Sequence, residues 1–400
     1  MNHTYKWKKA NIKKVICTII MFVLVIEIYG CNGIFSSNEK KVEAPEKQSL
    51  VIWSYYETDA QRDALDQLIR DFNQSQNEYS VSWEYVPMTV FAKGISSAYT
   101  ENKLPDMVIL DNPDMPSMIK LGMFEDITEK VSNWNLEKEY YSSIIETVKY
   151  EDRYYGIPFN CNSTALIYNK KMLEEAGEKI PTTWVEFKET ADRLTTKEHT
   201  GFTMCGMEGE QGAFQILSWI LAAGGSAPDI KGKAWQSTFQ FFSDLLKEDF
   251  MDENCINLTQ TDVAREFADE KTAMMQNGPW VFPMLDEAKV DYGIASIPGT
   301  HLNAAVVGGE NIGIIKGKNA EGSLKFLDFC MNSQEIIEFC QKASVLPAKI
   351  SAAREMAEEN EKLEVFVDQM ENAVTRTSID QWDVNARELT DEMYRLIAGK

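Results

Sequence analysis

The chain has 400 residues, of which 44% are hydrophobic and 26% charged, with 22 glycines and 12 prolines. This ordinary composition excludes a largely disordered, collagen-like or multi-span membrane protein, and the length predicts two or three domains. Of the 40 basic and 62 acidic residues, five lysines and one glutamate lie in the first thirty positions, so the rest of the chain carries −26. Since such an acidic surface repels phosphate backbones, we expect no nucleic-acid partner.

The first thirty residues have the pattern of a secretory signal. Five lysines precede an uncharged apolar run at 15–26. This run is shorter than the ~20 apolar residues of a membrane-spanning helix and suits a signal-peptide core. The segment 28–31, Ile-Tyr-Gly-Cys, resembles the bacterial lipobox. The resemblance implies a lipoprotein signal peptide over 1–30, cleavage before Cys31 and lipidation of that cysteine, with palmitate as an acyl group.

Two residues depart from the lipobox pattern, Glu27 at the end of the apolar core and the bulky Tyr29. An uncleaved N-terminal anchor is therefore the alternative. Both interpretations place the rest of the chain outside the cytoplasm and anchored to the cell membrane. The polar segment 31–48 is then a tether.

Strand and helix patterns alternate along the body of the chain. Short apolar or alternating runs predict strands, and apolar residues at helical spacing predict helices. The first series is a β-α-β-α-β pattern, which is typical of a largely parallel sheet covered by helices. Its predicted strands are 50–53, 81–86 and 107–110, and its helices are 60–73 and 90–101. A second series follows, with strands at 165–168, 291–296 and 311–315, a helix at 170–177 ending at Gly177, a helix capped by Thr182 or Thr183, and helices at 212–223, 234–248, 261–269, 320–331, 333–341, 351–358, 361–374 and 385–397.

The cysteines of the body do not suggest a cofactor. They are Cys161, Cys205, Cys255, Cys330 and Cys340, an odd number without CxxC spacing. We therefore expect no metal, no other cofactor and no redox motif. Ten residues on one predicted helix would separate Cys330 from Cys340 by about 15 Å, too far for a disulfide. Most of these cysteines are expected to be small buried hydrophobic residues.

Five stretches have a recognisable order and spacing. They are VIWSYYETDAQRDALDQLIRDFN (51–73), LPDMVILDNPDMPSMIKLGMFEDIT (104–128), YYGIPFNCNSTALIYNKKMLEEAGEKIPTTWVEF (154–187), MMQNGPWVF (274–282), and DYGIASIPG followed by GGENIGI (291–299 and 308–314). Together they resemble the extracellular solute-binding proteins of bacterial ABC transporters, specifically the large sugar-binding group that includes maltose-binding protein.

The resemblance implies an α/β, two-lobed periplasmic-binding-protein-like (type II) fold with the ligand in the cleft between the lobes. Each lobe is discontinuous, and ligand binding closes the lobes about a hinge. The expected boundaries are 49–160 and 300–348 for lobe one, 161–299 and 349–400 for lobe two, and crossings near 160–162, Gly299 and 346–347. The closed form is then recognised by the permease subunits of an ABC importer.

A sugar site needs hydrogen-bonding groups for the hydroxyls and flat aromatic rings for the C–H faces. The predicted loops supply both kinds of group. The candidate ligand contacts are Trp53, Tyr55, Tyr56 and Glu57 after the first strand; Asp111 and Asn112 after the third; Phe159, Asn160 and Asn162 at the crossover; Gln211, Phe214, Trp219 and Trp280 in lobe two; the backbone of Gly308 and Gly309 with Glu310; and Arg376 and Trp382 near the C-terminus.

Most candidates have a purely structural alternative. Trp53 continues an apolar strand and Trp219 lies among apolar residues, so both are also candidates for the core. Asp111 follows a buried strand, where ligands bind in open α/β sheets, yet it could form a turn or helix cap. Phe159 could pack the hinge. Asn162 stands where a relative may carry Glu, which leaves the identity of the sugar open.

The predicted function is that of a monomeric, lipid-anchored receptor without catalytic activity, which passes a mono- or oligosaccharide to an ABC importer. One alternative is a secreted glycoside hydrolase with two carboxylates about 5–10 Å apart. Another is the same fold with a peptide, a polyamine or glycerol phosphate as ligand. Only His199 and His301 lie outside the signal, which disfavours a nucleophile–histidine enzyme. The acidic, amide and aromatic site loops disfavour an anionic ligand.

Overall fold

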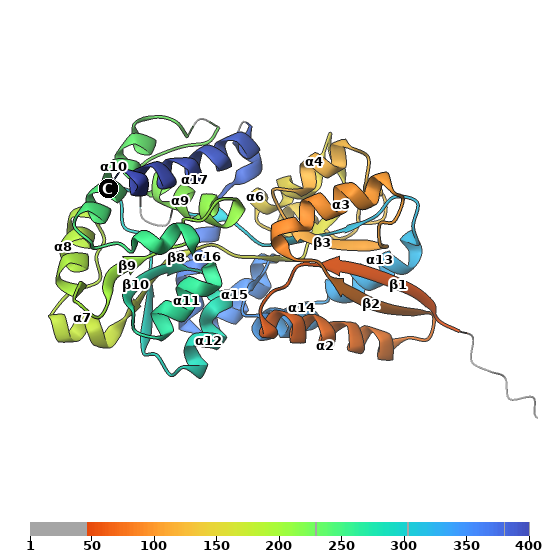
Figure 1. Ribbon diagram of the computed structural model, residues 1–400. Helices are drawn as coiled ribbons and strands as arrows, with labels where there is room; N and C mark the ends of the chain where they lie inside the picture. Colours follow the sequence, from red (N-terminus) through yellow and green to blue (C-terminus); the bar gives the residue numbers. More distant parts are fainter. Residues whose placement is uncertain (1–45, 229, 302–303, 380, 400) are drawn as a thin grey trace, which may run out of the picture. The chain divides into compact units, whose positions relative to one another are not determined.

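The computed structural model describes residues 46–400 except 229, 302–303, 380 and 400 (Figure 1). The chain divides into two units, Met1–Glu46 and Lys47–Lys400, and the helices and strands below belong to the second. The predicted signal peptide, Cys31 and nearly all of the tether lie outside the described residues. Within the described part of the chain, no helix combines the length and apolar character needed to cross a membrane.

The first sheet has the strand order β2-β1-β3-β13-β6. Its strands are β1 (Gln48–Ser54), β2 (Tyr79–Tyr85), β3 (Met107–Asp111), β6 (Gly156–Pro158) and β13 (Glu310–Ile314). β1 pairs in parallel with β2 and β3, whereas β13 runs antiparallel to β3 and β6. The largely parallel sheet expected for this region is therefore confirmed, with β13 as the reversed strand.

Helices cover both faces of the first sheet, and the alternation of side chains along β3 explains why every residue of that strand is buried. Met107 and Ile109 join the core formed with α2 (Asp59–Ser75), α13 (Ala320–Cys330) and α14 (Ser333–Ala343). Val108 and Leu110 join a separate core with α3 (Phe91–Thr100) and α4 (Met115–Lys120). Figure 1 shows α2 and α14 on one side of the sheet and α3 and α4 on the other.

The second sheet has the order β11-β8-β10-β9. It contains β8 (Ala165–Asn169), β9 (Thr200–Thr203), β10 (Thr272–Asn277) and β11 (Tyr292–Ala295). The sequence predicted β8 and β11 but missed β9 and β10. β10 reads Thr-Ala-Met-Met-Gln-Asn, which has few β-branched residues and ends in two amides, yet all six residues are buried. Its amides are satisfied, because Gln276 donates to Thr164 at 2.7 Å and accepts from Trp219 at 2.8 Å.

Local capping signals fix the ends of several helices, and those at Thr183 and Gly177 were predicted. Thr58 forms a capping box with Gln61 at the start of α2, and Thr183 forms one with Glu186 at the start of α8 (Trp184–Leu194). α7 (Lys170–Ala176) ends at Gly177, whose φ of 68° lies in the left-handed region. These motifs position the chain as it enters and leaves each sheet.

The remaining elements complete the layers around the two sheets. The helices are α5 (Leu136–Glu139), α6 (Ser142–Ile145), α9 (Glu210–Ala222), α10 (Lys233–Lys247), α11 (Gln260–Ala268), α12 (Phe282–Glu287), α15 (Ile350–Glu359), α16 (Glu364–Met370) and α17 (Trp382–Ala398), and the short strands are β4 (Lys149–Tyr150), β5 (Arg153–Tyr154), β7 (Asn160–Cys161), β12 (Val306–Val307), β14 (Leu346–Pro347) and β15 (Val374–Thr375). The single helix predicted at 361–374 is wrong, since a 3₁₀ turn precedes α16 and β15 follows it.

Chain segments that are distant in sequence meet where the predicted crossings lie. β7 pairs antiparallel with β14, and Asn162 forms an isolated bridge with Gly308. Two of the expected crossings, 160–162 and 346–347, are therefore neighbours. The lobe boundaries and the hinge motion about these segments stay predictions.

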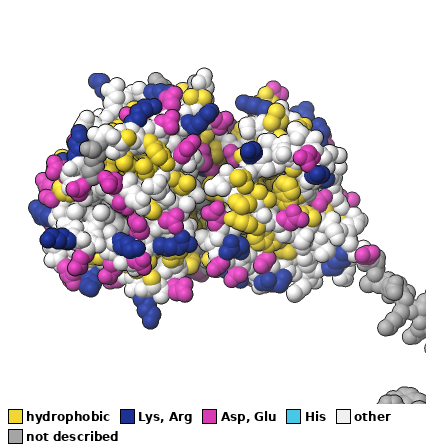
Figure 2. Space-filling view, viewed as in Figure 1, with side chains coloured by type: hydrophobic (Ala, Val, Ile, Leu, Met, Phe, Trp, Pro, Cys, Tyr) yellow, Lys and Arg dark blue, Asp and Glu magenta, His cyan; other side chains and the backbone are white. Residues whose placement is uncertain are grey.

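The cysteine prediction is partly corrected. Cys330 ends α13 and Cys340 lies within α14, so they belong to two helices and not to one. The expectation of buried thiols is confirmed, because all five body cysteines are free and buried. On the face shown in Figure 2, basic and acidic side chains are interspersed.

Candidate functional site

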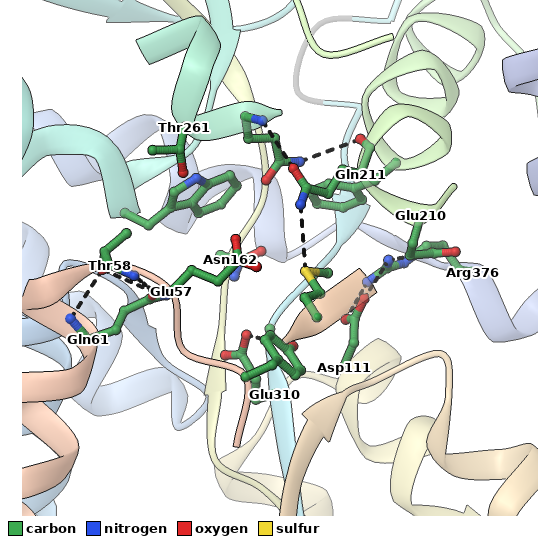
Figure 3. Close-up of a pocket in the computed structure, with 17 residues that line it drawn as sticks. Glu57, Thr58, Gln61, Asp111, Asn162, Glu210, Gln211, Thr261, Glu310 and Arg376 are labelled. Atoms are coloured by element: carbon green, nitrogen blue, oxygen red, sulfur yellow. Dashed lines mark hydrogen bonds and ion pairs between the residues drawn. The ribbon is translucent and has the colours of Figure 1, made fainter. Parts of the chain in front are cut away.

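A polar cavity of about 90 Å³ lies where residues of the two sheets and their helices converge. Figure 3 shows its lining, in which polar side chains face one another across the space. The lining residues are Tyr55, Glu57, Thr58, Gln61, Met88, Asp111, Asn162, Glu210, Gln211, Phe214, Gln260, Thr261, Trp280, Gly308, Gly309, Glu310 and Arg376.

The strand ends of the first sheet bring two carboxyl groups together. Asp111 is the last residue of β3, and Glu310, the first residue of the antiparallel β13, is its register partner. Tyr55 follows β1, and its hydroxyl donates to Glu310 Oε1 at 2.9 Å. Asp111 and Tyr55 lie at or just after the carboxyl ends of β3 and β1, where open α/β sheets bind ligands. The antiparallel pairing brings the amino end of β13, with Glu310, to the same edge of the sheet.

Burial is the main influence on the pKa of Glu310, which is only 6% exposed. It raises the pKa of this carboxyl group to about 7, and the charge of Asp111 acts in the same direction. Glu310 Oε2 has no hydrogen-bond partner among the described residues. Burial also raises the pKa of Tyr55, so this phenol remains a hydrogen-bond donor at neutral pH.

An ionic network around Arg376 starts from Asp111 and extends along the wall of the cavity. The guanidinium of Arg376 donates to both carboxylate oxygens of Asp111, at 2.8 and 3.0 Å, and to Glu210 Oε1 at 2.6 Å. It lies over the ring of Phe214, 4.7 Å from the centroid. Arg376 therefore links the end of β3 to the first residue of α9 (Figure 3). Burial lowers the pKa of Arg376, but the charges of Asp111 and Glu210 more than offset it and raise the pKa.

Residues behind the cavity hold this network. The Trp382 indole N–H donates to both oxygens of Glu210 at 3.1 Å, and Asn112 Oδ1 accepts from Arg376 at 3.2 Å. Burial raises the pKa of Glu210, whereas Arg376 opposes that shift. Burial and the charge of Asp111 raise the pKa of the nearby Asp114 to about 8. Three acidic groups, those of Asp111, Asp114 and Glu210, thus lie near a single guanidinium, that of Arg376.

Trp280 reaches the cavity because of the two residues before it. A Cβ atom on Gly278 would lie 1.9 Å from Cζ3 of Trp280, so only glycine lets the indole fold back over the chain. Pro279 follows as the first residue of a 3₁₀ turn, Pro279–Val281, which starts directly after β10. The Gly-Pro-Trp motif thus sets the orientation of the indole ring.

A second glycine pair allows close approach of the backbone. A Cβ atom on Gly308 would lie 2.1 Å from Asn162 Oδ1, and Gly309 has a φ of 109°. Any larger residue at 308 would displace the Asn162 amide from the cavity. Asn162 and Gly308 also exchange backbone hydrogen bonds at 2.8 and 3.0 Å.

Six lining residues were missed by the sequence analysis. They are Thr58, Gln61, Met88, Glu210, Gln260 and Thr261. Except for Met88, they lie at or just before the first turns of α2, α9 and α11. The backbone N–H of Gln260 donates to Gln211 Oε1 at 3.0 Å, and this hydrogen bond fixes the start of α11 next to Gln211. Helix starts next to a predicted site loop were the available signal, whereas nothing in the sequence singled out Met88.

The cavity gathers most of the predicted contacts. Those that line it are Tyr55, Glu57, Asp111, Asn162, Gln211, Phe214, Trp280, Gly308, Gly309, Glu310 and Arg376. Asn112 and Trp382 support the network around Arg376. Tyr56 and Asn160 lie behind Glu310, where the Asn160 amide donates to the Tyr56 hydroxyl at 2.9 Å.

The structure places three predicted contacts away from the cavity lining. Trp219 is fully buried in an aromatic core with Phe187 and Phe202. Phe159 packs on Phe339, with their centroids 4.7 Å apart. Trp53 is half-buried, and its indole N–H donates to Glu84 at 2.9 Å. The alternative given for Trp219, a place in the core, is confirmed. Phe159 is also buried in the core, and its role in a hinge stays a prediction.

Among the described residues, no group of three or more His, Cys, Asp or Glu side chains is arranged to hold a metal ion. The cavity combines acceptors, amides and rings, and is therefore suited to holding a small polar molecule with several hydrogen bonds.

Comparison with known proteins identifies the family. The model of the bacterial extracellular solute-binding proteins matches residues 67–365. The chain belongs to this family. It is thus a solute-binding protein and not an enzyme, and the predicted resemblance is confirmed.

Individual relatives of this solute-binding protein are distant. A multiple sugar-binding protein of Streptococcus mutans is 23% identical over 339 residues, 79% of each chain. An sn-glycerol-3-phosphate-binding periplasmic protein of Brucella melitensis is 23% identical over 344 residues, which are 77% of this chain and 76% of the relative. A solute-binding protein of Thermotoga lettingae, solved with α-D-tagatose, superposes with a TM-score of 0.80 at 22% identity, covering 88% and 95% of the two chains. That similarity confirms the two-lobed α/β fold.

Proposed function

We propose that this solute-binding protein captures a sugar in the cavity between its sheets and delivers it to an ABC importer. The observation that carries the proposal is the lining itself. Carboxylates and amides from several elements face a space that is also bordered by the rings of Tyr55, Phe214 and Trp280. Sugars present hydroxyls around their edge and C–H groups on their faces, and this combination suits both.

The size of the cavity supports closure around the ligand. A volume of about 90 Å³ is below the roughly 300–1,000 Å³ of typical ligand pockets. We infer that the lobes open about 160–162 and 346–347 to admit the sugar, and that the ion pairs of Arg376 hold the narrow form.

A phosphate-bearing ligand, as the name of the Brucella relative would suggest, is disfavoured by the charges. Arg376 is the one cationic residue of the described lining. It is 2% exposed, and both Asp111 and Glu210 accept hydrogen bonds from it. A phosphate would have to displace these carboxylates.

The sugar assignment predicts a response in a thermal-shift screen of the protein from Ser49 onward. Mono- and oligosaccharides, sn-glycerol 3-phosphate and spermidine should be compared. A sugar at about 100 times its Kd should stabilise the native state by about 2.7 kcal/mol and raise Tm by roughly 4 °C. The same sugar should change the intrinsic fluorescence, because Trp280 borders the cavity. A flat response to a broad glycan panel, with a shift for phosphate or polyamine, would contradict the proposal.

We also propose that the receptor is anchored by lipid on Cys31. Cys31→Ala should release the full-length protein from an acyl-labelled membrane fraction. Labelling with a palmitate analogue and membrane fractionation test this, with Cys17→Ala as the matched control. Acylated, membrane-bound Cys31→Ala protein would show that the lipobox interpretation is wrong.

A further inference from the structure

The cavity holds more carboxyl groups than its one cationic residue can pair, and burial raises the pKa of one of them, Glu310, to about 7, so this group titrates near neutral pH. Four carboxyl groups line it, those of Glu57, Asp111, Glu210 and Glu310, against the one guanidinium of Arg376. That guanidinium already forms ion pairs with Asp111 and Glu210. Neither Glu57 nor Glu310 forms an ion pair with a described residue. The carboxyl groups without an ion pair are therefore Glu57 and Glu310, and Glu310 lies beside Asp111 of the ionic network as its register partner.

Glu310 is the most constrained of these carboxyl groups. One oxygen accepts from the Tyr55 hydroxyl at 2.9 Å, and the other is buried without a hydrogen-bond partner. A buried acceptor without a partner is costly to keep in a folded protein. In Figure 3 the Glu310 side chain lies below Asn162, on the same side of the cavity as Asp111. A donor on the ligand would satisfy the free oxygen.

An ammonium group is a better donor for this position than a hydroxyl. Both can donate to the free oxygen, but the positive charge of a bound ammonium also lowers the raised pKa of Glu310 and so favours the ionised carboxylate. Charge-assisted hydrogen bonds are roughly twice as strong as neutral ones. The rings of Tyr55, Phe214 and Trp280 line the cavity, and aromatic rings attract cations at their faces. Arg376 over Phe214 already uses one of these faces in this way.

We propose that the preferred ligand is an amino sugar, whose protonated amine binds the free oxygen of Glu310. This inference rests on the proposed function. It narrows the class of ligand from sugars in general to cationic polyols. The remaining hydroxyls would be bound by the amide and carboxylate groups of the lining.

Matched sugar trios test the proposal by titration calorimetry at pH 7. Each trio holds an amine, its N-acetyl form and the corresponding hydroxyl sugar: glucosamine, N-acetylglucosamine and glucose; the galactose equivalents; and the β-1,4 dimers glucosamine dimer, N,N′-diacetylchitobiose and cellobiose. At least one amine should bind about tenfold or more tightly than both of its neutral counterparts.

Glu310→Gln removes the charge and keeps an amide oxygen that can accept from Tyr55. This variant should lose the preference for the amine, with the amine weakened about tenfold or more and the neutral counterpart changed less than threefold. Glu355→Gln, on the exposed side of α15, is the matched control for loss of one negative charge and should retain the preference. The melting temperature of each variant shows whether it is folded.

The outcomes separate this inference from the proposed function. If a neutral sugar binds as tightly as its amine, or if Glu310→Gln keeps the preference, the amino-sugar inference is overturned and sugar binding stands. If folded protein binds none of the trio sugars but binds another neutral glycan, the inference is likewise overturned. If it binds no sugar at all, the proposed function fails as well.

Discussion

Replacing Arg376 with methionine is expected to lower the free energy of unfolding by about 3–5 kcal/mol and to weaken ligand binding at least about tenfold. The substitution leaves Asp111, which is 7% exposed, without its bidentate partner. Among the described residues, it also leaves Glu210 with only the Trp382 indole as a side-chain donor. An uncompensated buried carboxylate is costly, so the loss should exceed that of the hydrogen bonds alone.

Urea denaturation of the unliganded protein measures this effect. The matched control is Arg354→Met, because Arg354 pairs with Glu371 and both side chains are more than half exposed, at 60% and 54%. Breaking such an exposed pair should cost about 1 kcal/mol or less. Arg376→Lys keeps the charge but not the planar fork, and should fall between wild type and Arg376→Met. Equal losses at positions 376 and 354 would refute the structural role of the network.

The sequence predicted four of the five strands of the first sheet, because their signals are local, and missed the short β6. The strand at 107–110 is an uninterrupted apolar run, and helices flank it on both sides. Thr183 and Gly177 mark helix ends through capping and through a left-handed φ, which depend on neighbouring residues only. β10 was missed since Gln276 is stable in the core only through partners more than fifty positions away, Thr164 and Trp219.

The site was predicted in part for a similar reason. Asp111 was identifiable because it follows a predicted strand, and Glu310 because it follows Gly308 and Gly309 in a stretch that resembles the family. The pairing of Arg376 with Asp111 joins positions 265 apart in the sequence, and only the fold brings them together. The tryptophans show the same limit of predicting site residues from the sequence. Trp280 follows Gly-Pro, which aims its ring, whereas composition alone could not distinguish the buried Trp219 from a ligand platform.

Trp280→Ala is expected to weaken sugar binding at least tenfold, which is about 1.4 kcal/mol or more. The indole borders the cavity and is the largest ring in its lining. Its loss removes a flat apolar face on which the C–H groups of a sugar could stack. The variant should also lose most of the ligand-induced change in intrinsic fluorescence, because the remaining tryptophans lie outside the lining.

The matched control is Trp53→Ala. Trp53 is half-buried, and its indole N–H donates a hydrogen bond to Glu84. Glu84 lies on β2, and neither residue lines the cavity. Affinity in this variant should stay within about threefold of wild type. Both variants should be titrated well below their melting temperatures, so that a stability loss does not mimic a binding loss. Unchanged affinity in Trp280→Ala, or an equal loss in Trp53→Ala, would exclude Trp280 as the stacking residue. Tyr55 and Phe214 would then be the remaining rings of the described lining that could contact the sugar.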